Sequence, residues 1–174
     1  MIILKNKKLI AVIIFLVAAT LILVYINMRN IDTSAGEDKT ITVIWGESSV
    51  KLQFDELISL DNKEFNATED TSKSGPASRR YKGVLLKDLL NKASVDDLAI
   101  KGYSKVLVKG LDGYVIALSV DEILSGNNVF IAFEKDGKPL GTMKKGGSGP
   151  FQLIARSDMF SQRWCKYVYE VVLE

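Results

Sequence analysis

The feature that most constrains this chain is an uncharged apolar run of 18 residues near its N-terminus, residues 9–26. As a helix the run would extend about 27 Å at 1.5 Å per residue, close to the thickness of the hydrocarbon core of a bilayer. Three lysines precede it, whereas a single arginine follows before the first acidic residues. Because Lys and Arg are enriched on the cytoplasmic side of a span, we expect the N-terminus inside and the rest of the chain outside.

A cleaved secretory signal peptide is the alternative interpretation of this run. Signal peptides have a shorter apolar region, about 7–15 residues, followed closely by small residues at the cleavage site. Here the nearest such residues, Thr33-Ser34-Ala35, match poorly and lie well past the run, and no cysteine for lipid attachment stands near its end. We therefore expect an uncleaved, single-pass anchor in the cell membrane. The expected parts are a cytoplasmic segment 1–8, a transmembrane anchor 9–27, a linker 28–39 and an extracytoplasmic domain 40–174.

The charge of the expected domain differs from that of the whole chain. The formal net charge of the chain is +2, but from Glu37 onward 20 acidic residues outnumber 19 basic ones, which gives a net charge of −1. The excess positive charge therefore belongs to the N-terminal segment. A domain with this balance does not predict bulk nucleic-acid binding.

The chain has no histidine and one cysteine, Cys165. Serine and cysteine hydrolase sites that depend on histidine, most zinc sites and any internal disulfide are therefore excluded. No run of carboxylates has the spacing of a calcium-binding loop. We assign no catalytic residue and no metal ligand from the residue types.

From residue 40 onward, short β-branched and aromatic stretches alternate with turn signals, which is typical of an α+β domain. Strands are expected at 40–45, 49–54, 104–109, 115–118, 129–134, 151–155 and 167–173. Leucines at helical spacing predict a helix over 85–92, a capping box of Ser119 and Glu122 predicts another, and Asp55 would cap a helical turn over 55–60. The polar composition of 61–80 predicts a long exposed loop with one short strand at 65–68.

The strongest charge asymmetry of the domain lies in 135–166, which holds seven basic and two acidic residues. Within it a glycine-rich turn precedes a strand, and backbone N–H groups of such turns can approach an anion closely. The basic side chains would add charge, and a tryptophan would form a flat apolar wall. The alternatives are a hairpin turn, a solvated basic loop and core packing of the tryptophan. The candidate binding residues in this stretch are Gly146, Gly147, Ser148, Gly149, Arg163, Trp164 and Lys166.

Two arginines in the first half of the domain, Arg79 and Arg80, are expected to close the same site from the far side. The alternative is that both belong to a solvated loop. A small anionic ligand and the membrane are the partners that these observations predict.

Four segments, in order, resemble the sulfite oxidase-type molybdopterin-binding domain. Residues 81–90, YKGVLLKDLL, resemble that family's aromatic-x-Gly-Val-x-Leu-x-x-Leu-Leu segment, and Asp112-Gly113-Tyr114 is similar to its Asp-Gly-Tyr strand. Residues 129–140, VFIAFEKDGKPL, look like its hairpin, and Gly149-Pro150 with Arg163-Trp164 resembles its Gly-Gly-Pro and Lys-Trp ending. The resemblance runs from about residue 41 to residue 173. It implies that family's α+β fold of mixed and antiparallel strands with short helices, preceded here by one transmembrane helix.

The resemblance also implies a molybdopterin cofactor, whose molybdenum is bound by a cysteine thiolate located before the aromatic-x-Gly-Val segment. The corresponding stretch here, 65–80, contains no cysteine. Cys165 falls where the family has an apolar residue, so we interpret it as a small buried side chain. The histidine contacts of the family are absent as well, and Gln152 stands where a basic residue is common.

Three interpretations follow. A degenerate family member would keep the fold and an anion or pterin pocket without oxo transfer, because it lacks the soft ligand expected for molybdenum. An active molybdopterin-dependent oxidoreductase would replace the thiolate by an oxygen ligand such as Asp70, Ser72 or Ser74. A cofactor-free tethered module would use the fold for binding or interaction alone. Both cofactor interpretations require the glycine turn, Arg163, Trp164 and the stretch 65–80 to line one concave site.

Overall fold

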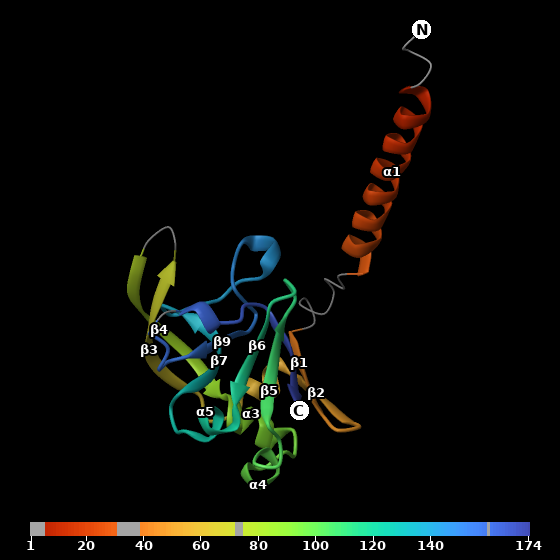
Figure 1. The fold of residues 1–174 in the computed structure, drawn as a ribbon. Coiled ribbons are helices and arrows are strands. Elements are labelled where there is room, and N and C mark those ends of the chain that lie inside the picture. Colours follow the sequence, from red (N-terminus) through yellow and green to blue (C-terminus); the bar gives the residue numbers. More distant parts are fainter. Residues whose placement is uncertain (1–5, 31–38, 72–74, 160) are drawn as a thin grey trace. The chain divides into compact units, whose positions relative to one another are not determined.

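The computed structural model of the chain describes residues 6–30, 39–71, 75–159 and 161–174. It forms two compact units, Met1–Asp32 and Thr33–Glu174 (Figure 1). The described residues of the first unit form one helix, α1 (Asn6–Asn30), which includes the apolar run. Much of the expected linker, residues 31–38, and residues 1–5 of the expected cytoplasmic segment lie outside the described residues.

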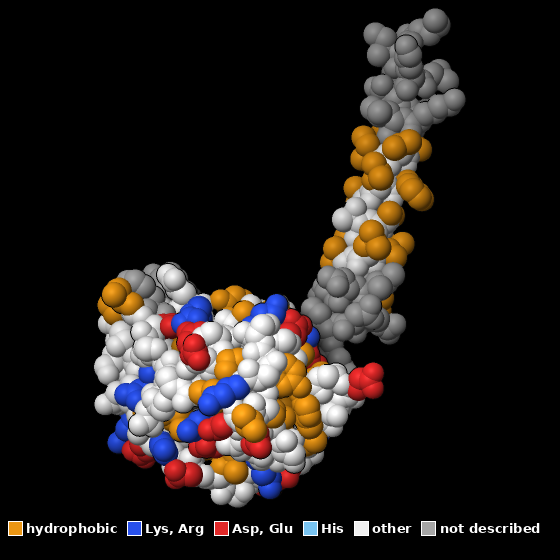
Figure 2. Space-filling model, turned by 60° about the horizontal axis from the view of Figure 1, so that its bottom comes forward, with side chains coloured by type: hydrophobic (Ala, Val, Ile, Leu, Met, Phe, Trp, Pro, Cys, Tyr) orange, Lys and Arg blue, Asp and Glu red, His pale blue; other side chains and the backbone are white. Residues whose placement is uncertain are grey.

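The side chains described in α1 are those of residues 10–25, and its large hydrophobic residues are exposed (Figure 2). The two ends of the expected anchor, residue 9 and residues 26–27, have side chains outside the described set. Across the described residues, no helix combines the length and the apolarity that crossing a membrane requires.

In the second unit, the described residues form two five-stranded sheets. The first sheet contains β1 (Thr40–Trp45), β2 (Ser48–Gln53), β5 (Lys105–Gly110), β6 (Val115–Ser119) and β10 (Val168–Leu173), in the order β2-β1-β10-β5-β6. The pairing of β1 with β10 is parallel and the other pairings are antiparallel. The expected mixed α+β fold is therefore confirmed.

The second sheet contains β3 (Lys63–Thr71), β4 (Gly75–Leu85), β7 (Val129–Lys135), β8 (Lys138–Pro139) and β9 (Gln152–Ala155). Along it the order is β3-β4-β7-β8, and β9 also pairs with β7. All five residues from Val129 to Phe133 are buried, because β7 is covered on both faces. Strands buried on both sides appear in sequence as continuous apolar runs.

The expected loop over 61–80 is wrong, because β3 and β4 form a long antiparallel hairpin there (Figure 1). The polar composition hid a weak alternation, in which Phe65 and Ala67 are buried and their neighbours are exposed. Phe65 stacks on Phe130 of β7 with ring centroids 4.0 Å apart. This long-range packing overrides the local propensity of the segment, as is common for strands.

The short helices largely follow the sequence patterns. They are α2 (Phe54–Ile58), α3 (Leu86–Lys92), α4 (Asp97–Ile100), α5 (Val120–Leu124) and the 3₁₀ turns η1 (Met143–Lys145) and η2 (Ser161–Arg163). The capping box of Ser119 and Glu122 at α5 is confirmed. The cap of α2 differs from the expectation, because Gln53 and Glu56, and not Asp55, form it.

The two faces of the second sheet belong to two hydrophobic clusters. Val84, Ile131 and Leu153 point into the larger cluster, which is shared with the first sheet and α3. Leu85 and Phe130, their neighbours along the strands, point into a smaller cluster with Trp164. Since successive side chains of a strand face opposite ways, one strand pair supplies both cores.

We expect Gly83→Ala to destabilise the domain by about 2 kcal/mol or more, because a methyl group there has no room. Gly83 lies at an irregularity in the β4–β7 pairing, and an added Cβ would lie 2.7 Å from the Cα of Ala132 and collide with the Ile131 carbonyl. The measurement is urea denaturation followed by tryptophan fluorescence. Gly126→Ala is the matched control, since a Cβ at that position meets open space. Equal losses in the two variants would contradict the packing described for β4 and β7.

Candidate functional site

A groove of about 450 Å³ opens between the β7–β8 turn and the loop that follows η1. Four of the expected binding residues line it: Gly146, Gly147, Ser148 and Lys166. The remaining charged residues of its lining come from β3, β7, the β7–β8 turn and β8, and they are Glu69, Lys135, Asp136 and Lys138. The structure thus brings the glycine turn, one expected lysine and the β3–β4 hairpin to one concave surface.

The backbone N–H groups of the glycine turn are not available to a ligand, contrary to our expectation. Those of Gly146 and Gly147 donate to the carbonyl oxygens of Met143 and Thr142 at 2.9 and 3.0 Å. Those of Ser148 and Gly149 donate to the carbonyls of residues 140 and 141 at 3.2 and 2.8 Å. The turn is therefore closed on itself, and it shapes the groove without supplying donors.

Close packing explains why glycine stands at position 147. An added Cβ there would collide with the carbonyl oxygens of Leu140 and Gly141. The carbonyl oxygen of Gly147 accepts a hydrogen bond from the Tyr167 hydroxyl at 2.6 Å, which holds the turn against the start of β10. Tight approach of two backbone segments is a typical reason for glycine.

The two carboxylates of the groove already have cationic neighbours. Glu69 accepts a hydrogen bond from the Lys135 ammonium at 2.6 Å, and the Arg79 guanidinium lies 3.9 Å from the same carboxylate. Arg79 also lies 3.8 Å from Asp136. Within the described part of the chain, Lys138 and Lys166 have no carboxylate partner. The unmatched charge of the groove is therefore positive and sits on these two lysines.

Arg79 and Arg80 do not act together, because neighbouring residues of β4 face opposite ways. Arg79 is half-buried beside the groove, whereas Arg80 is exposed. The backbone of Arg80 contacts a residue of the groove lining. Its N–H donates to the Asp136 carboxylate at 3.2 Å, and its carbonyl accepts from the Asp136 N–H at 2.7 Å. Arg80 thus positions the β7–β8 turn and contributes no side chain to the groove.

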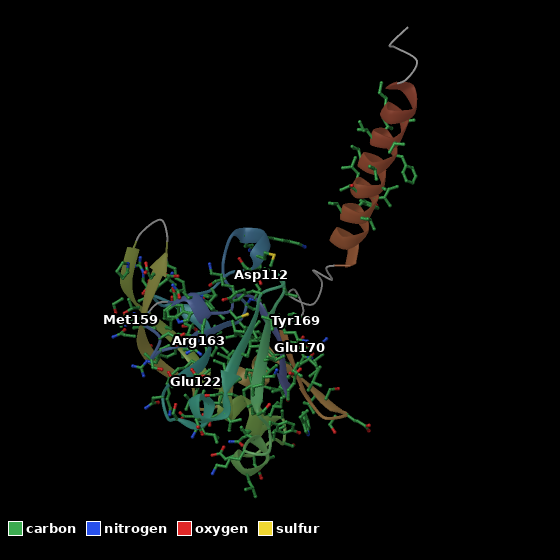
Figure 3. The ribbon with its side chains drawn as sticks, viewed as in Figure 1. Asp112, Glu122, Met159, Arg163, Tyr169 and Glu170 are labelled. Carbon is green, nitrogen blue, oxygen red and sulfur yellow. The ribbon has the colours of Figure 1, made fainter. Side chains whose placement is uncertain are left out.

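Arg163 lies outside the groove lining and is held by two carboxylates. Its guanidinium donates to both oxygens of Asp158 and, at 2.7 Å, to Glu122 on α5 (Figure 3). These hydrogen bonds raise the pKa of Arg163 and lower the pKa of Glu122. The positive charge expected for an anion is therefore used inside the protein, where it ties η2 to α5.

Trp164 is a core residue, as the alternative interpretation had it. It is 7% exposed, and its indole N–H donates to the Ala155 carbonyl at 3.2 Å. Its ring meets Tyr81 edge-on with centroids 5.7 Å apart. It forms no wall of the groove. Because Arg163 also lies outside the lining, the single concave site that both cofactor interpretations require is not formed.

Cys165 is completely buried in the larger cluster, at 0% exposure. Burial, with a smaller contribution from Asp112, raises the pKa of its thiol to about 12. A thiol with so high a pKa stays protonated at neutral pH, and only the thiolate is a good metal ligand. The single cysteine is therefore neither located nor ionised for metal binding.

Of the proposed oxygen ligands, only Asp70 lies among the described residues. The backbone N–H and carbonyl of Asp70 both bond to the Ser161 hydroxyl, at 3.0 and 2.8 Å, which pins the outer strand to η2. Ser72 and Ser74 lie outside the described residues. Among the described residues, no group of three or more Asp, Glu, Cys or His is placed to hold a metal ion.

Sequence reasoning missed Glu69 and Tyr81. Among the residues that the structure describes, the buried Tyr81 hydroxyl has no hydrogen-bond partner, and neither does the buried Arg79 Nε atom. Burial, followed by the charge of Glu69, raises the pKa of Tyr81. These residues could have been found only by predicting the β3–β4 hairpin. Its register places Phe65 opposite Tyr81 and Ala67 opposite Arg79.

The chain is similar to known proteins in both sequence and fold. The family model described as the oxidoreductase molybdopterin binding domain matches residues 42–174. The crystal structure of the sulfane dehydrogenase SoxCD from Paracoccus pantotrophus is similar, with a TM-score of 0.63 and 17% identity over 78% of this chain and 38% of that chain. This chain therefore spans about two fifths of the SoxCD chain, and at this identity the likeness shows the fold alone. No curated protein matches the chain. The family resemblance seen in the sequence is confirmed.

We expect Arg163→Gln to cost about 1–2 kcal/mol of stability at neutral pH, a value discounted because the Arg163 side chain is 41% exposed. The lowered pKa of Glu122 means that this stabilisation is present above the carboxylate's unfolded pKa and is lost as the pH falls through its folded pKa. The loss should therefore shrink below about pH 4. Denaturation at pH 7 and at acidic pH measures it.

Arg156→Gln is the control for this pH dependence. Its guanidinium donates to the backbone carbonyls of Asn66 and Asn127, which do not titrate. Its cost should be the same at both pH values. An Arg163→Gln loss that is equally independent of pH would contradict the ion pairs described above.

The Cys165 thiol should not react with an aromatic disulfide reagent at pH 8 until the protein is unfolded, because it is buried and protonated. Absorbance of the released thiolate gives the count. Leu98→Cys, at a position 79% exposed, is the control that should react at once and add one accessible thiol per chain. Full reaction of the native wild-type chain would show that Cys165 is reachable.

Proposed function

Because the chain belongs to the oxidoreductase molybdopterin-binding domain family, we propose that it is a degenerate member whose groove binds a small anion. In this proposal the protein is anchored in the membrane, works outside the cytoplasm and holds no molybdenum through a thiolate. The observation that carries the proposal is the pair Lys138 and Lys166, two unmatched cations lining a groove that no thiol reaches.

The position of the one cysteine supports the proposal that the protein does not bind molybdenum through a thiolate. The family resemblance puts the ligating cysteine before the aromatic-x-Gly-Val segment, and in this chain that stretch is the cysteine-free β3–β4 hairpin. The one available thiol is fully buried among apolar side chains. These residues do not fit a thiolate-bound molybdenum.

The composition of the groove supports anion binding. Glu69 is matched by Lys135 and Arg79, which leaves the ammonium groups of Lys138 and Lys166 for a ligand. Each lysine would contribute about 1 kcal/mol to the binding free energy of a nearby anion at this exposed surface. A volume of about 450 Å³ suits a small molecule, and Leu140 offers it an apolar contact.

Residues 9–27 are the proposed anchor, with the N-terminus in the cytoplasm. The three lysines before the run and its 18 uncharged residues support this assignment. The full chain should remain in the membrane pellet after an alkaline carbonate wash and enter solution only with detergent. Release of the intact chain by carbonate alone would refute the anchor.

Inorganic phosphate is the probe for the groove. Titrated into the full-length protein in detergent, it should shift the amide NMR signals of residues 146–148 and 166. Replacing both lysines, in Lys138→Gln with Lys166→Gln, should weaken binding about tenfold or more, because two charge contacts are lost. Lys101→Gln, which removes an exposed charge outside the groove lining, should leave it unchanged. Equal affinity in the double variant would refute the site, as would shifts confined to other residues.

A further inference from the structure

A second hollow, of about 330 Å³, lies beside the groove and shares Pro139 and Leu140 with it. Unlike the groove, it is mainly apolar. Its lining includes Phe54, Phe133, Leu140 and Pro150, together with two lysines at positions 39 and 145. The two aromatic rings meet edge-on with centroids 5.9 Å apart, and the Lys39 ammonium lies 5.2 Å from the centre of the Phe54 ring.

An exposed methionine stands next to this hollow in the chain. Met143 opens η1, is 37% exposed, and is followed directly by Lys144 and Lys145, both exposed. An exposed apolar side chain beside lysines combines, on a small scale, the two residue types that amphipathic segments present to a lipid surface. We call Lys39, Phe54, Met143 and Lys145 with their hollow the tether face.

The covalent connection to the proposed anchor enters the domain on this face. Lys39 is the last residue of the expected linker 28–39, and β1 begins at the next residue. The chain between the end of α1 and this face, residues 31–39, can reach about 30 Å at most. The opposite end of the domain, which carries α4, is far from the η1 segment (Figure 1).

We propose that the tether face contacts the anionic phospholipid surface of the membrane that holds α1. Lys39 and Lys145 would pair with anionic headgroups, and Met143 would enter the interface beside the apolar hollow. Each lysine close to an anionic lipid surface is attracted to it, and this attraction weakens with salt. The inference rests on the proposed anchor, and its role would be to orient the neighbouring anion groove relative to the membrane.

The test uses the full chain in nanodiscs of phosphatidylglycerol or phosphatidylcholine that contain nitroxide-labelled lipid. Met143→Cys carries an environment-sensitive fluorophore, while the buried Cys165 stays unlabelled. We expect quenching of this fluorophore in phosphatidylglycerol discs, with less quenching in phosphatidylcholine or high salt. Leu98→Cys on α4, labelled in the same way, should not be quenched.

Charge reversal supplies the second arm. The double variant Lys39→Glu with Lys145→Glu should lower the equilibrium constant for contact between the tether face and the lipid surface. The expected factor is about fivefold for each lysine, measured as loss of quenching. Equal quenching at Met143→Cys and Leu98→Cys in incorporated chains would overturn this inference and leave the anchor standing, as would quenching that ignores lipid charge. A chain that does not co-purify with the discs would overturn the anchor and this inference together.

Discussion

Burial of β7 on both faces is the constraint on which the rest of the domain depends. Its side chains alternate between the two hydrophobic clusters, and its edges pair with β4 on one side and with β8 and β9 on the other. Gly83 permits the close approach of β4. The end of β7 and the turn after it place Lys135 and Asp136 in the lining of the groove. Core packing and the candidate site therefore share one strand.

The β3–β4 hairpin determines what the groove can bind. It occupies the stretch in which the family resemblance implies a metal-binding cysteine, and it contributes Glu69 and Arg79 instead. Glu69 fixes Lys135, so part of the positive charge is neutralised within the protein. What remains available is the pair Lys138 and Lys166, which can attract an anion but cannot tune a metal as a thiolate does.

Patterns that depend on near neighbours were readable from the sequence. The capping box at α5 joins Ser119 to Glu122 three residues later, and the leucine face of α3 repeats within one helix. The family motifs added the fold class, a mixed α+β domain. These are local or inherited signals, and each survived in the structure.

Contacts between residues far apart in the chain could not be predicted from such local patterns. Arg163 pairs with Glu122, 41 residues earlier, so its charge looked free in the sequence. The β3–β4 hairpin depends on packing of Phe65 against Phe130, which polar composition concealed. The N–H groups of the glycine turn are used by residues 140–143, a loop geometry that residue types alone do not specify.

The molybdenum and pterin content of the purified full-length protein tests the central claim most directly. The protein should be made in a host that synthesises and exports the cofactor, beside a family member that has the ligating cysteine. The account predicts a folded chain without stoichiometric molybdenum or pterin next to a loaded control. Stoichiometric molybdenum and pterin in this chain would contradict it and would show that a ligand other than a thiolate holds the metal.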